Sequence, residues 1–151
     1  MQNMRHHLLY GYNLNRSVEF RVTSGLLINI RDARVKKLSD TSARLLRVFI
    51  EGTQNGLVSD DDIARDVFES AGLKSSSSRI RGVIRDLKDA FRDLGFHPDF
   101  ISRHIRQGYY VHFDKVEFLI ALDNSMEWPH DSGFYTECDD CGGNQVVIRK
   151  L

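Results

Sequence analysis

Residues 75–91 have the sequence SSSSRIRGVIRDLKDAF, and the apolar side chains of this stretch recur at helical spacing. Four of them fall on one side of an α-helix, namely Ile80, Ile84, Leu87 and Phe91. The serines at its start can cap the N-terminus, and Gly95 can end the helix. The spacing therefore predicts a helix from residue 75 to about residue 94.

The opposite side of this helix is polar, and its charges are unevenly distributed. Its first half carries Ser78, Arg79, Arg81, Gly82 and Arg85, and its second half carries Asp86, Asp89 and Asp93. Arginines in the first turns suit insertion into a DNA major groove. The alternative is a solvated helix face. Gly82 costs a helix about 1 kcal/mol relative to alanine, so it is either a tolerated surface residue or a place of close approach.

Two shorter helices are expected before this one. Ser39 can cap an apolar stripe over residues 43–50, which Gly52 ends. Ser59 precedes three aspartates at 60–62, which suit the positive end of a helix dipole, and we expect this second helix to run to about residue 69.

Strand-like segments flank the three helices. Residues 10–35 consist of short β-prone pieces separated by turn signals, which predicts an antiparallel meander. Residues 100–105 and 108–113 predict a hairpin that turns around Arg106, Gln107 and Gly108. The order of sheet, three helices and hairpin predicts an α+β fold.

The zero net charge of the chain conceals an uneven distribution. Residues 1–112 hold 18 basic and 13 acidic residues, whereas residues 113–151 hold 3 and 8. A basic body with an acidic extension favours an anionic partner for the body.

Four pieces in this order resemble the winged-helix effector domain of OmpR/PhoB-type bacterial transcription regulators, in the ToxR/CadC-like branch. The resemblance covers roughly residues 10–113. The pieces are LSDTSARLLRVFI (38–50), GLVSDDDIARDVF (56–68), SSSSRIRGVIRDLKDAF (75–91) and ISRHIRQGYYV (101–111).

The resemblance implies a winged helix-turn-helix: an N-terminal antiparallel sheet, three helices and a C-terminal β-hairpin wing. It further implies a sequence-specific DNA-binding transcription regulator, binding double-stranded DNA as a homodimer. Residues 75–94 would be the recognition helix in the major groove, and residues 103–109 the wing on the minor groove or backbone. The loop 70–74 would be able to contact RNA polymerase. By position, the DNA-binding residues would be Ser78, Arg79, Arg81, Gly82, Arg85, Arg103, His104, Arg106 and Gln107.

The sequence also departs from the family pattern. Val67 and Phe68 stand where the family often has a tryptophan, which is a change within the core. Asp86 and Asp89 stand where relatives often carry arginine or lysine, so phosphate contact from the middle of the helix should be weaker. From the length and the apolar runs of this sequence we expect neither a receiver domain nor the membrane anchor common in this branch.

The acidic extension, residues 114–151, lies outside the resemblance. Two strands at 131–138 and 144–151 are expected to form a small β-hairpin around CDDCGG. Cys138 and Cys141 have the spacing of half a zinc ribbon, which His130, His112 or a second chain could complete. The same spacing suits a dithiol switch, although neighbouring aspartates would raise the thiol pKa. No other cofactor is expected.

Other classes of function have less support. The histidines are scattered, and no nucleophile elbow or glycine-rich phosphate loop is present, so we expect no enzymatic activity. The rival function is a winged-helix protein–protein interaction module that modulates another regulator without binding DNA. The longest apolar run is the five residues 118–122, and the start has no apolar segment, so we expect a cytoplasmic protein without membrane contact.

Overall fold

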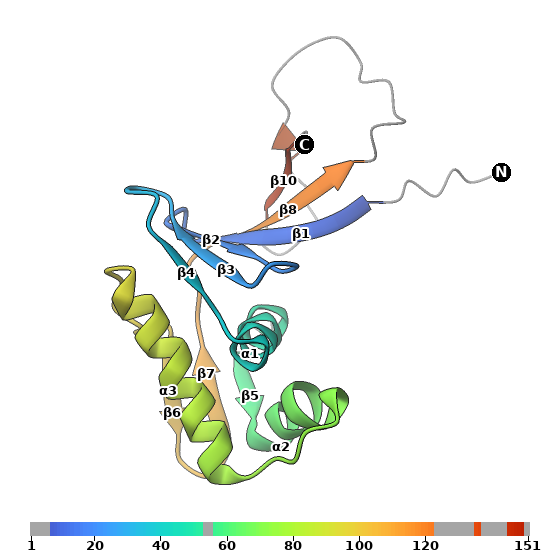
Figure 1. Cartoon of the computed structure of the whole chain (residues 1–151), viewed down its shortest axis with the longest axis vertical. Coiled ribbons are helices and arrows are strands. Elements are labelled where there is room, and N and C mark those ends of the chain that lie inside the picture. Colours follow the sequence, from blue (N-terminus) through green and yellow to red (C-terminus); the bar gives the residue numbers. More distant parts are fainter. Residues whose placement is uncertain (1–6, 53–55, 123–134, 137–144, 150–151) are drawn as a thin grey trace, which may run out of the picture.

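The computed structural model describes residues 7–52, 56–122, 135–136 and 145–149 (Figure 1). The fold is α+β, as predicted, with three helices and two largely antiparallel sheets. Its helices are α1 (Asp40–Glu51), α2 (Asp60–Ile63, continued by a π turn and a 3₁₀ turn) and α3 (Ser77–Asp93). Its strands are β1 (His7–Leu14), β2 (Val18–Arg21), β3 (Leu26–Asn29), β4 (Val35–Lys37), β5 (Leu57–Ser59), β6 (Ile101–His104), β7 (Gly108–Val111), β8 (Val116–Leu122), β9 (Tyr135–Thr136) and β10 (Gln145–Arg149).

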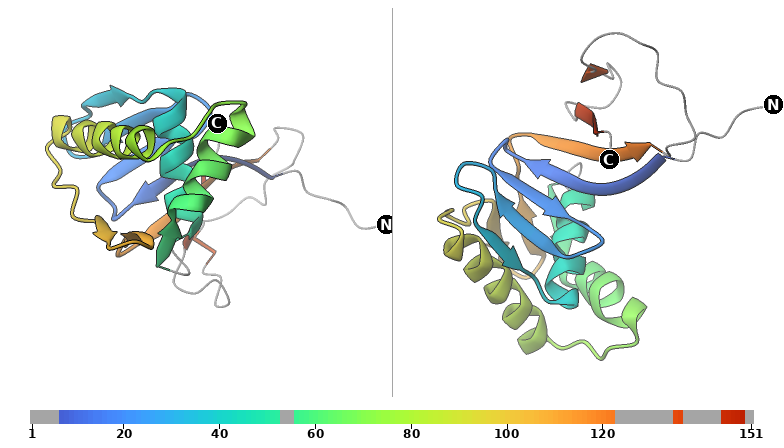
Figure 2. Two further views of the ribbon diagram at one scale, coloured as in Figure 1. Left: turned by 90° about the horizontal axis from the view of Figure 1, so that it is seen from below. Right: turned by 45° about the horizontal axis from the view of Figure 1, so that its top comes forward.

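The larger sheet has the strand order β4-β3-β2-β1-β8-β10-β9. The first four strands form the predicted antiparallel meander. β8 pairs antiparallel with β1 along seven residues, and the two long strands lie side by side in Figure 1 and in the right-hand view of Figure 2. Residues 116–122 belong to the extension that was predicted to begin at residue 114. In the structure they nevertheless form a strand of the N-terminal sheet.

The acidic extension contributes two further strands to this sheet. β10 pairs parallel with β8, and β9 pairs antiparallel with β10. The β-rich character predicted for the extension is confirmed over these seven residues. Cys138 and Cys141 lie outside the part of the chain that the structure describes.

The smaller sheet has the order β5-β7-β6 and contains the predicted hairpin as β6 and β7. Figure 1 shows α3 running alongside this hairpin, at the end of the molecule opposite β1 and β8. The arrangement is compatible with a winged helix, in which β6 and β7 would be the wing.

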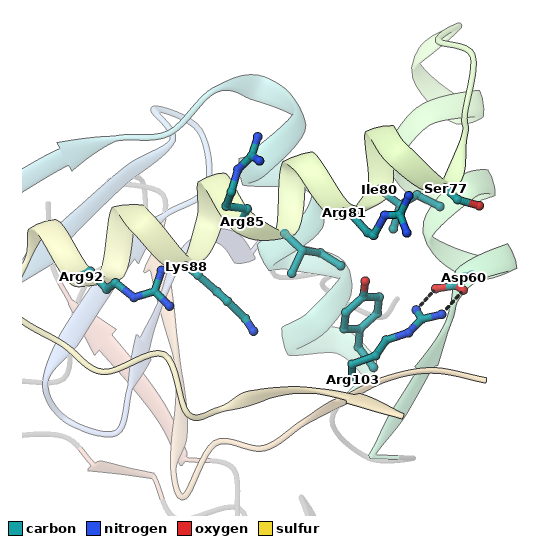
Figure 3. Close-up of a pocket in the computed structure, with 10 residues that line it drawn as sticks. Asp60, Ser77, Ile80, Arg81, Arg85, Lys88, Arg92 and Arg103 are labelled. Carbon is teal, nitrogen blue, oxygen red and sulfur yellow. Dashed lines mark hydrogen bonds and ion pairs between the residues drawn. The ribbon is translucent and has the colours of Figure 1, made fainter. Parts of the chain in front are cut away.

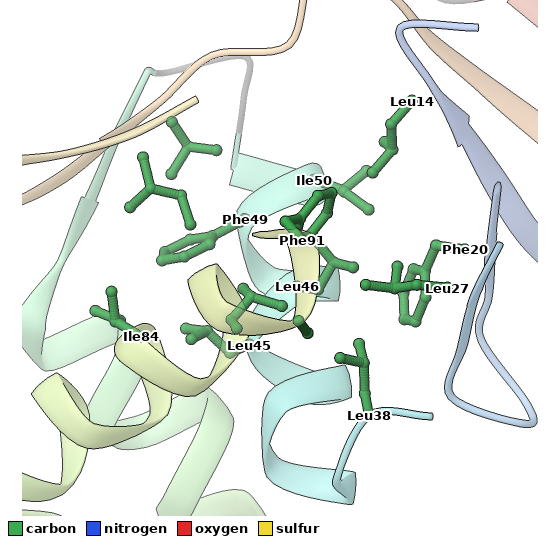
Figure 4. Close-up of a cluster of buried hydrophobic side chains, with 14 of the residues drawn as sticks. Leu14, Phe20, Leu27, Leu38, Leu45, Leu46, Phe49, Ile50, Ile84 and Phe91 are labelled. Carbon is green, nitrogen blue, oxygen red and sulfur yellow. The ribbon is translucent and has the colours of Figure 1, made fainter. Parts of the chain in front are cut away.

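The core lies between α1, α3 and the inner face of the larger sheet. Leu45, Leu46 and Phe49 of α1 are fully buried. Figure 4 shows them between α3 and the strands, with contributions from Phe20, Leu27, Ile84 and Phe91. The amphipathic spacing of both helices explains this arrangement, since each places an apolar stripe toward the other.

The caps of the helices follow the sequence signals closely. The Ser39 hydroxyl accepts a hydrogen bond from the Ser42 amide at 3.1 Å, and the Ser59 hydroxyl accepts one from the Asp62 amide at 3.0 Å. Ser76 caps α3 by accepting from the Arg79 amide at 3.2 Å. These side chains satisfy amides that have no partner within the helix.

The second helix is less regular than predicted. After Ile63 it widens into a π turn, Ala64–Phe68, and then tightens into a 3₁₀ turn, Glu69–Ala71. With the wider turn, Ile63, Val67 and Phe68 are all buried. A regular helix would turn the adjacent residues Val67 and Phe68 to different sides. Arg44 donates from Nε to the Val67 carbonyl at 3.0 Å.

In the part of the chain that the structure describes, no helix is both long enough and apolar enough to cross a membrane.

Candidate nucleic-acid interface

A groove of about 610 Å³ lies between α3, the β6–β7 hairpin and the start of α2 (Figure 3). We call it the basic groove, because five of its lining side chains are cations. Its residues are Asp60, Ser77, Ile80, Arg81, Ile84, Arg85, Lys88, Arg92, Arg103 and Tyr109.

Four cations of α3 form one continuous stripe along the groove. Arg81, Arg85, Lys88 and Arg92 follow one another at spacings of four, three and four residues, which places them on the same side of a helix. At 1.5 Å per residue the stripe is about 16 Å long. Ile80 and Ile84 lie beside it and are buried. The stripe therefore presents positive charge along three turns of α3.

The C-terminal end of α3 is attached to the larger sheet by side chains of β3 and of the loop that follows it. The buried Asn29 donates from Nδ2 to the Leu94 carbonyl at 2.9 Å. Arg34 donates to the same carbonyl at 2.9 Å and to the Asp93 carbonyl at 3.3 Å. These bonds satisfy carbonyls at the helix end and set the position of α3 relative to the sheet.

The acidic residues of α3 are partly offset by cations. Asp93 pairs with Lys36 of β4 at 2.8 Å, and Asp89 pairs with Arg92 at 2.7 Å. Asp86 lies 4.0 Å from Arg85. All these groups are exposed, so each pair contributes little to stability. Within the described residues, Arg81 and Lys88 form no ion pair, so their charges are available to a ligand.

Arg103 forms the opposite edge of the groove and is held in place from two sides. Its Nη1 and Nη2 donate to Oδ1 and Oδ2 of Asp60 at 2.6 and 2.9 Å. Its guanidinium also lies 4.7 Å from the centre of the Tyr109 ring. The hydrogen bonds to Asp60 raise the pKa of Arg103 above its ordinary value. The geometry fixes the guanidinium, and the carboxylate offsets part of its charge.

The structure brings together only some of the residues predicted to bind DNA. Three of the predicted residues line the basic groove: Arg81 and Arg85 on the edge formed by α3, and Arg103 on the edge formed by the hairpin. Ser78, Arg79 and Gly82 lie on α3 but do not line the groove. Arg79 donates to the Lys74 carbonyl at 2.8 Å, which ties α3 to the loop before it. A methyl group added at Gly82 would meet no atom within 4 Å apart from the adjoining backbone of α3, so the rest of the chain leaves that position open.

The other three predicted residues lie at the tip of the hairpin. His104 and Gln107 close a turn through a bond from the Gln107 amide to the His104 carbonyl at 3.3 Å. Between them, Arg106 has a φ of 64° and is exposed. They are separate from the groove's lining and extend the surface beyond Arg103.

Sequence reasoning missed Lys88, Arg92 and Asp60 as parts of this site. The first two could have been found, because they continue the spacing that begins at Arg81 and Arg85. Asp60 was assigned only to the start of a helix, and its bond to Arg103 spans 43 residues. No local pattern indicates such a pair.

Neither the known family models nor the curated proteins contain a match to this chain. The resemblance to OmpR/PhoB-type regulators therefore stays a prediction. The described residues include no group of three or more histidine, cysteine, aspartate or glutamate side chains able to hold a metal. The zinc site predicted at Cys138 and Cys141 falls outside them and stays a prediction too.

Proposed function

We propose that the protein is a sequence-specific DNA-binding transcription regulator. In this proposal α3 enters the major groove, and the β6–β7 hairpin contacts the adjacent minor groove or backbone. The observation that carries it is the basic stripe of α3, which faces Arg103 of the hairpin across the basic groove. Two separate elements thus direct cations toward one space.

The chemistry of this space suits a phosphate backbone. Duplex DNA carries one negative charge per about 1.7 Å of its axis, so a stripe about 16 Å long can meet several phosphates. Arginine can also hold a guanine edge or a phosphate through two parallel hydrogen bonds. If α3 and the hairpin enter neighbouring grooves, one phosphate strand would pass between them through the basic groove.

The remaining predicted residues take complementary parts in this proposal. Ser78, Arg79 and Gly82 belong to the first turns of α3, where a recognition helix approaches base edges. Two copies would bind repeated half-sites about one helical turn apart. The segment 70–74 would contact RNA polymerase, as the family resemblance implies. The protein would act in the bacterial cytoplasm.

A matched pair of double variants tests the proposal. Arg81→Gln with Arg85→Gln removes two charges from the groove. The control, Arg47→Gln with Arg65→Gln, also removes two positive charges. These two arginines are exposed on other helical segments and do not line the groove. Glutamine keeps the helix propensity of arginine. Fluorescence anisotropy with the gene's own upstream DNA and with a random duplex measures both binding and preference.

We expect the groove variant to lose its preference for the upstream DNA and most of its affinity. The control variant should bind nearly as the wild type does, because its charges lie outside the contact. Equal losses in the two variants would show that only the net charge matters and would refute the assignment of Arg81 and Arg85 as DNA contacts.

The second candidate is a module that binds a protein partner. The exposed aspartates Asp86 and Asp89 beside the stripe favour it, because they would repel phosphate. This candidate predicts a shallow dependence of binding on salt and no binding to duplex DNA.

A further inference from the structure

The tip of the β6–β7 hairpin presents an apolar side chain to solvent. Ile105 is 80% exposed, far more than any other large hydrophobic residue described as exposed. The next is Val35 at 55%. Ile105 does not belong to the buried core cluster, so its side chain is available to a ligand that meets the tip of the hairpin.

The backbone around Ile105 holds it in a defined position. Arg106, next to it, adopts a left-handed conformation that favours glycine. Gly108 has a φ of 144°, and a methyl group there would lie 2.1 Å from the Val58 carbonyl oxygen, so β7 approaches β5 too closely for any side chain. The ring of His104 meets the edge of Tyr110 at 5.1 Å. The tip is thus a supported turn.

The charges near Ile105 indicate the chemical class of the ligand that its side chain contacts. Residues 101–112 include Arg103 and Arg106 and no acidic residue. Through Arg103 the hairpin also forms one edge of the basic groove. An apolar tip between cationic groups complements a polyanion with an apolar interior, and duplex DNA has this character, since stacked bases lie between two phosphate strands.

We propose that Ile105 inserts from the minor groove between two base pairs, unstacks them and bends the DNA. Arg106 would hold a phosphate or a base edge beside the opened step. This inference rests on the proposed function and adds a bend to it. Apolar wedges of this kind kink duplexes toward the major groove. Pyrimidine–purine steps unstack most easily and should be preferred at the tip.

The surroundings of Ile105 do not suit a protein partner. A stable protein interface covers about 800 Å² on each side and has an apolar centre. Of the exposed large hydrophobic residues in the described part of the chain, only Tyr110 at 45% shares the hairpin with Ile105. One exposed isoleucine next to Arg106 offers too little apolar area for such an interface, whereas it can fit a narrow slot.

Energy transfer between dyes at the two ends of a duplex of about 20 bp measures the bend. We expect binding of the wild-type protein to raise the transfer efficiency by roughly half, as a bend near 60° would. Ile105→Ala should still bind, within a few-fold of the wild type, and the rise should be mostly lost. The exposure of Ile105 means that the variant should melt at the wild-type temperature.

The chain supplies a matched control in another turn. Ile30 is 43% exposed in the turn between β3 and β4, and it too is followed by an arginine, Arg31. Ile30→Ala should bend DNA as the wild type does. If Ile105→Ala bends DNA equally, or if the wild type binds without a rise in transfer, the wedge is refuted while DNA binding stands.

Two further outcomes separate this inference from the proposed function. If the wild type binds no duplex at low salt, both fail. If Ile105→Ala changes the sedimentation of the free protein, the side chain belongs to a contact between copies, and the wedge is refuted.

Discussion

Arg103 and Asp60 form two parallel hydrogen bonds, 2.6 and 2.9 Å long, between the hairpin and the first residue of α2. Among the described residues that line the basic groove, Asp60 is the only carboxylate, and it is bound to one of the five cations. Asp60 orients Arg103 and at the same time reduces the positive charge that the groove offers to phosphate.

The first prediction concerns this carboxylate. Asp60→Asn keeps an oxygen that can accept from Arg103 but removes the negative charge. We expect affinity for a random duplex to rise about three-fold at low salt, from the loss of one repulsive charge at the groove edge. Anisotropy at low and high salt checks it, and the gain should shrink at high salt. Weaker binding would show that orientation of Arg103 matters more than its charge.

The second prediction compares two glycines. Gly82→Ala should stabilise the fold by about 0.5–1 kcal/mol, because the added methyl group meets no atom and alanine favours the helix. Gly108→Ala should destabilise it by more than about 2 kcal/mol, because the methyl group would overlap Val58. Urea unfolding measures both. A destabilised Gly82→Ala would mean that the position is not open.

The Gly82→Ala variant also tests how close DNA approaches α3. If the position marks a close approach, the stabilised variant should lose affinity for the upstream DNA. If Gly82 is only a tolerated surface residue, binding should be unchanged.

The third prediction concerns the attachment of α3. Asn29 is 5% exposed and donates to Leu94 while its Oδ1 accepts from the Arg31 amide at 2.9 Å. Asn29→Asp keeps the size but places a carboxylate against the Leu94 carbonyl. We expect a loss of about 1–3 kcal/mol or more in the free energy of unfolding, measured with urea. Unchanged stability would show that the hydrogen bond from Asn29 to Leu94 does not hold α3 against the sheet.

The fourth prediction concerns acid. The hydrogen bond from the Ser59 hydroxyl, 2.7 Å long, and the one from Arg65, 2.8 Å long, lower the pKa of Asp62. A carboxyl whose pKa is lower in the folded state stabilises the fold above its ordinary pKa, and the contribution is lost as the pH falls through the folded value. Asp62→Asn should therefore lower the melting temperature at pH 7, and its difference from the wild type should disappear well below about pH 4. If the melting temperatures of Asp62→Asn and the wild type still differed in acid, the stabilisation would not come from the charge of Asp62.

Much of the fold could be predicted because its signals are local. Ser39, Ser59 and Gly95 mark helix ends within a few residues of the groups they satisfy, and the hairpin turn is equally short. The pairing of β8 with β1 joins residues about a hundred positions apart, and β8 carries no mark of its partner. The π turn after Ile63 accompanies the burial of both Val67 and Phe68 in the core, which the local sequence does not indicate.

The candidate site divides in the same way. The stripe from Arg81 to Arg92 is periodic on one helix and could be predicted in full from its spacing. The edge formed by Arg103 depends on how the hairpin lies against α2, so its partner Asp60 emerges only from the folded chain.

The central claim is that the basic groove binds the phosphate backbone of DNA. The most direct measurement is the affinity of the wild-type protein for a fluorescent random duplex over a series of NaCl concentrations. Each phosphate neutralised adds about −0.9 to the slope of log affinity against log salt, so the five cations of the groove predict a slope of about −3 to −5. A slope no steeper than about −1, or no binding at the lowest salt, would contradict the claim.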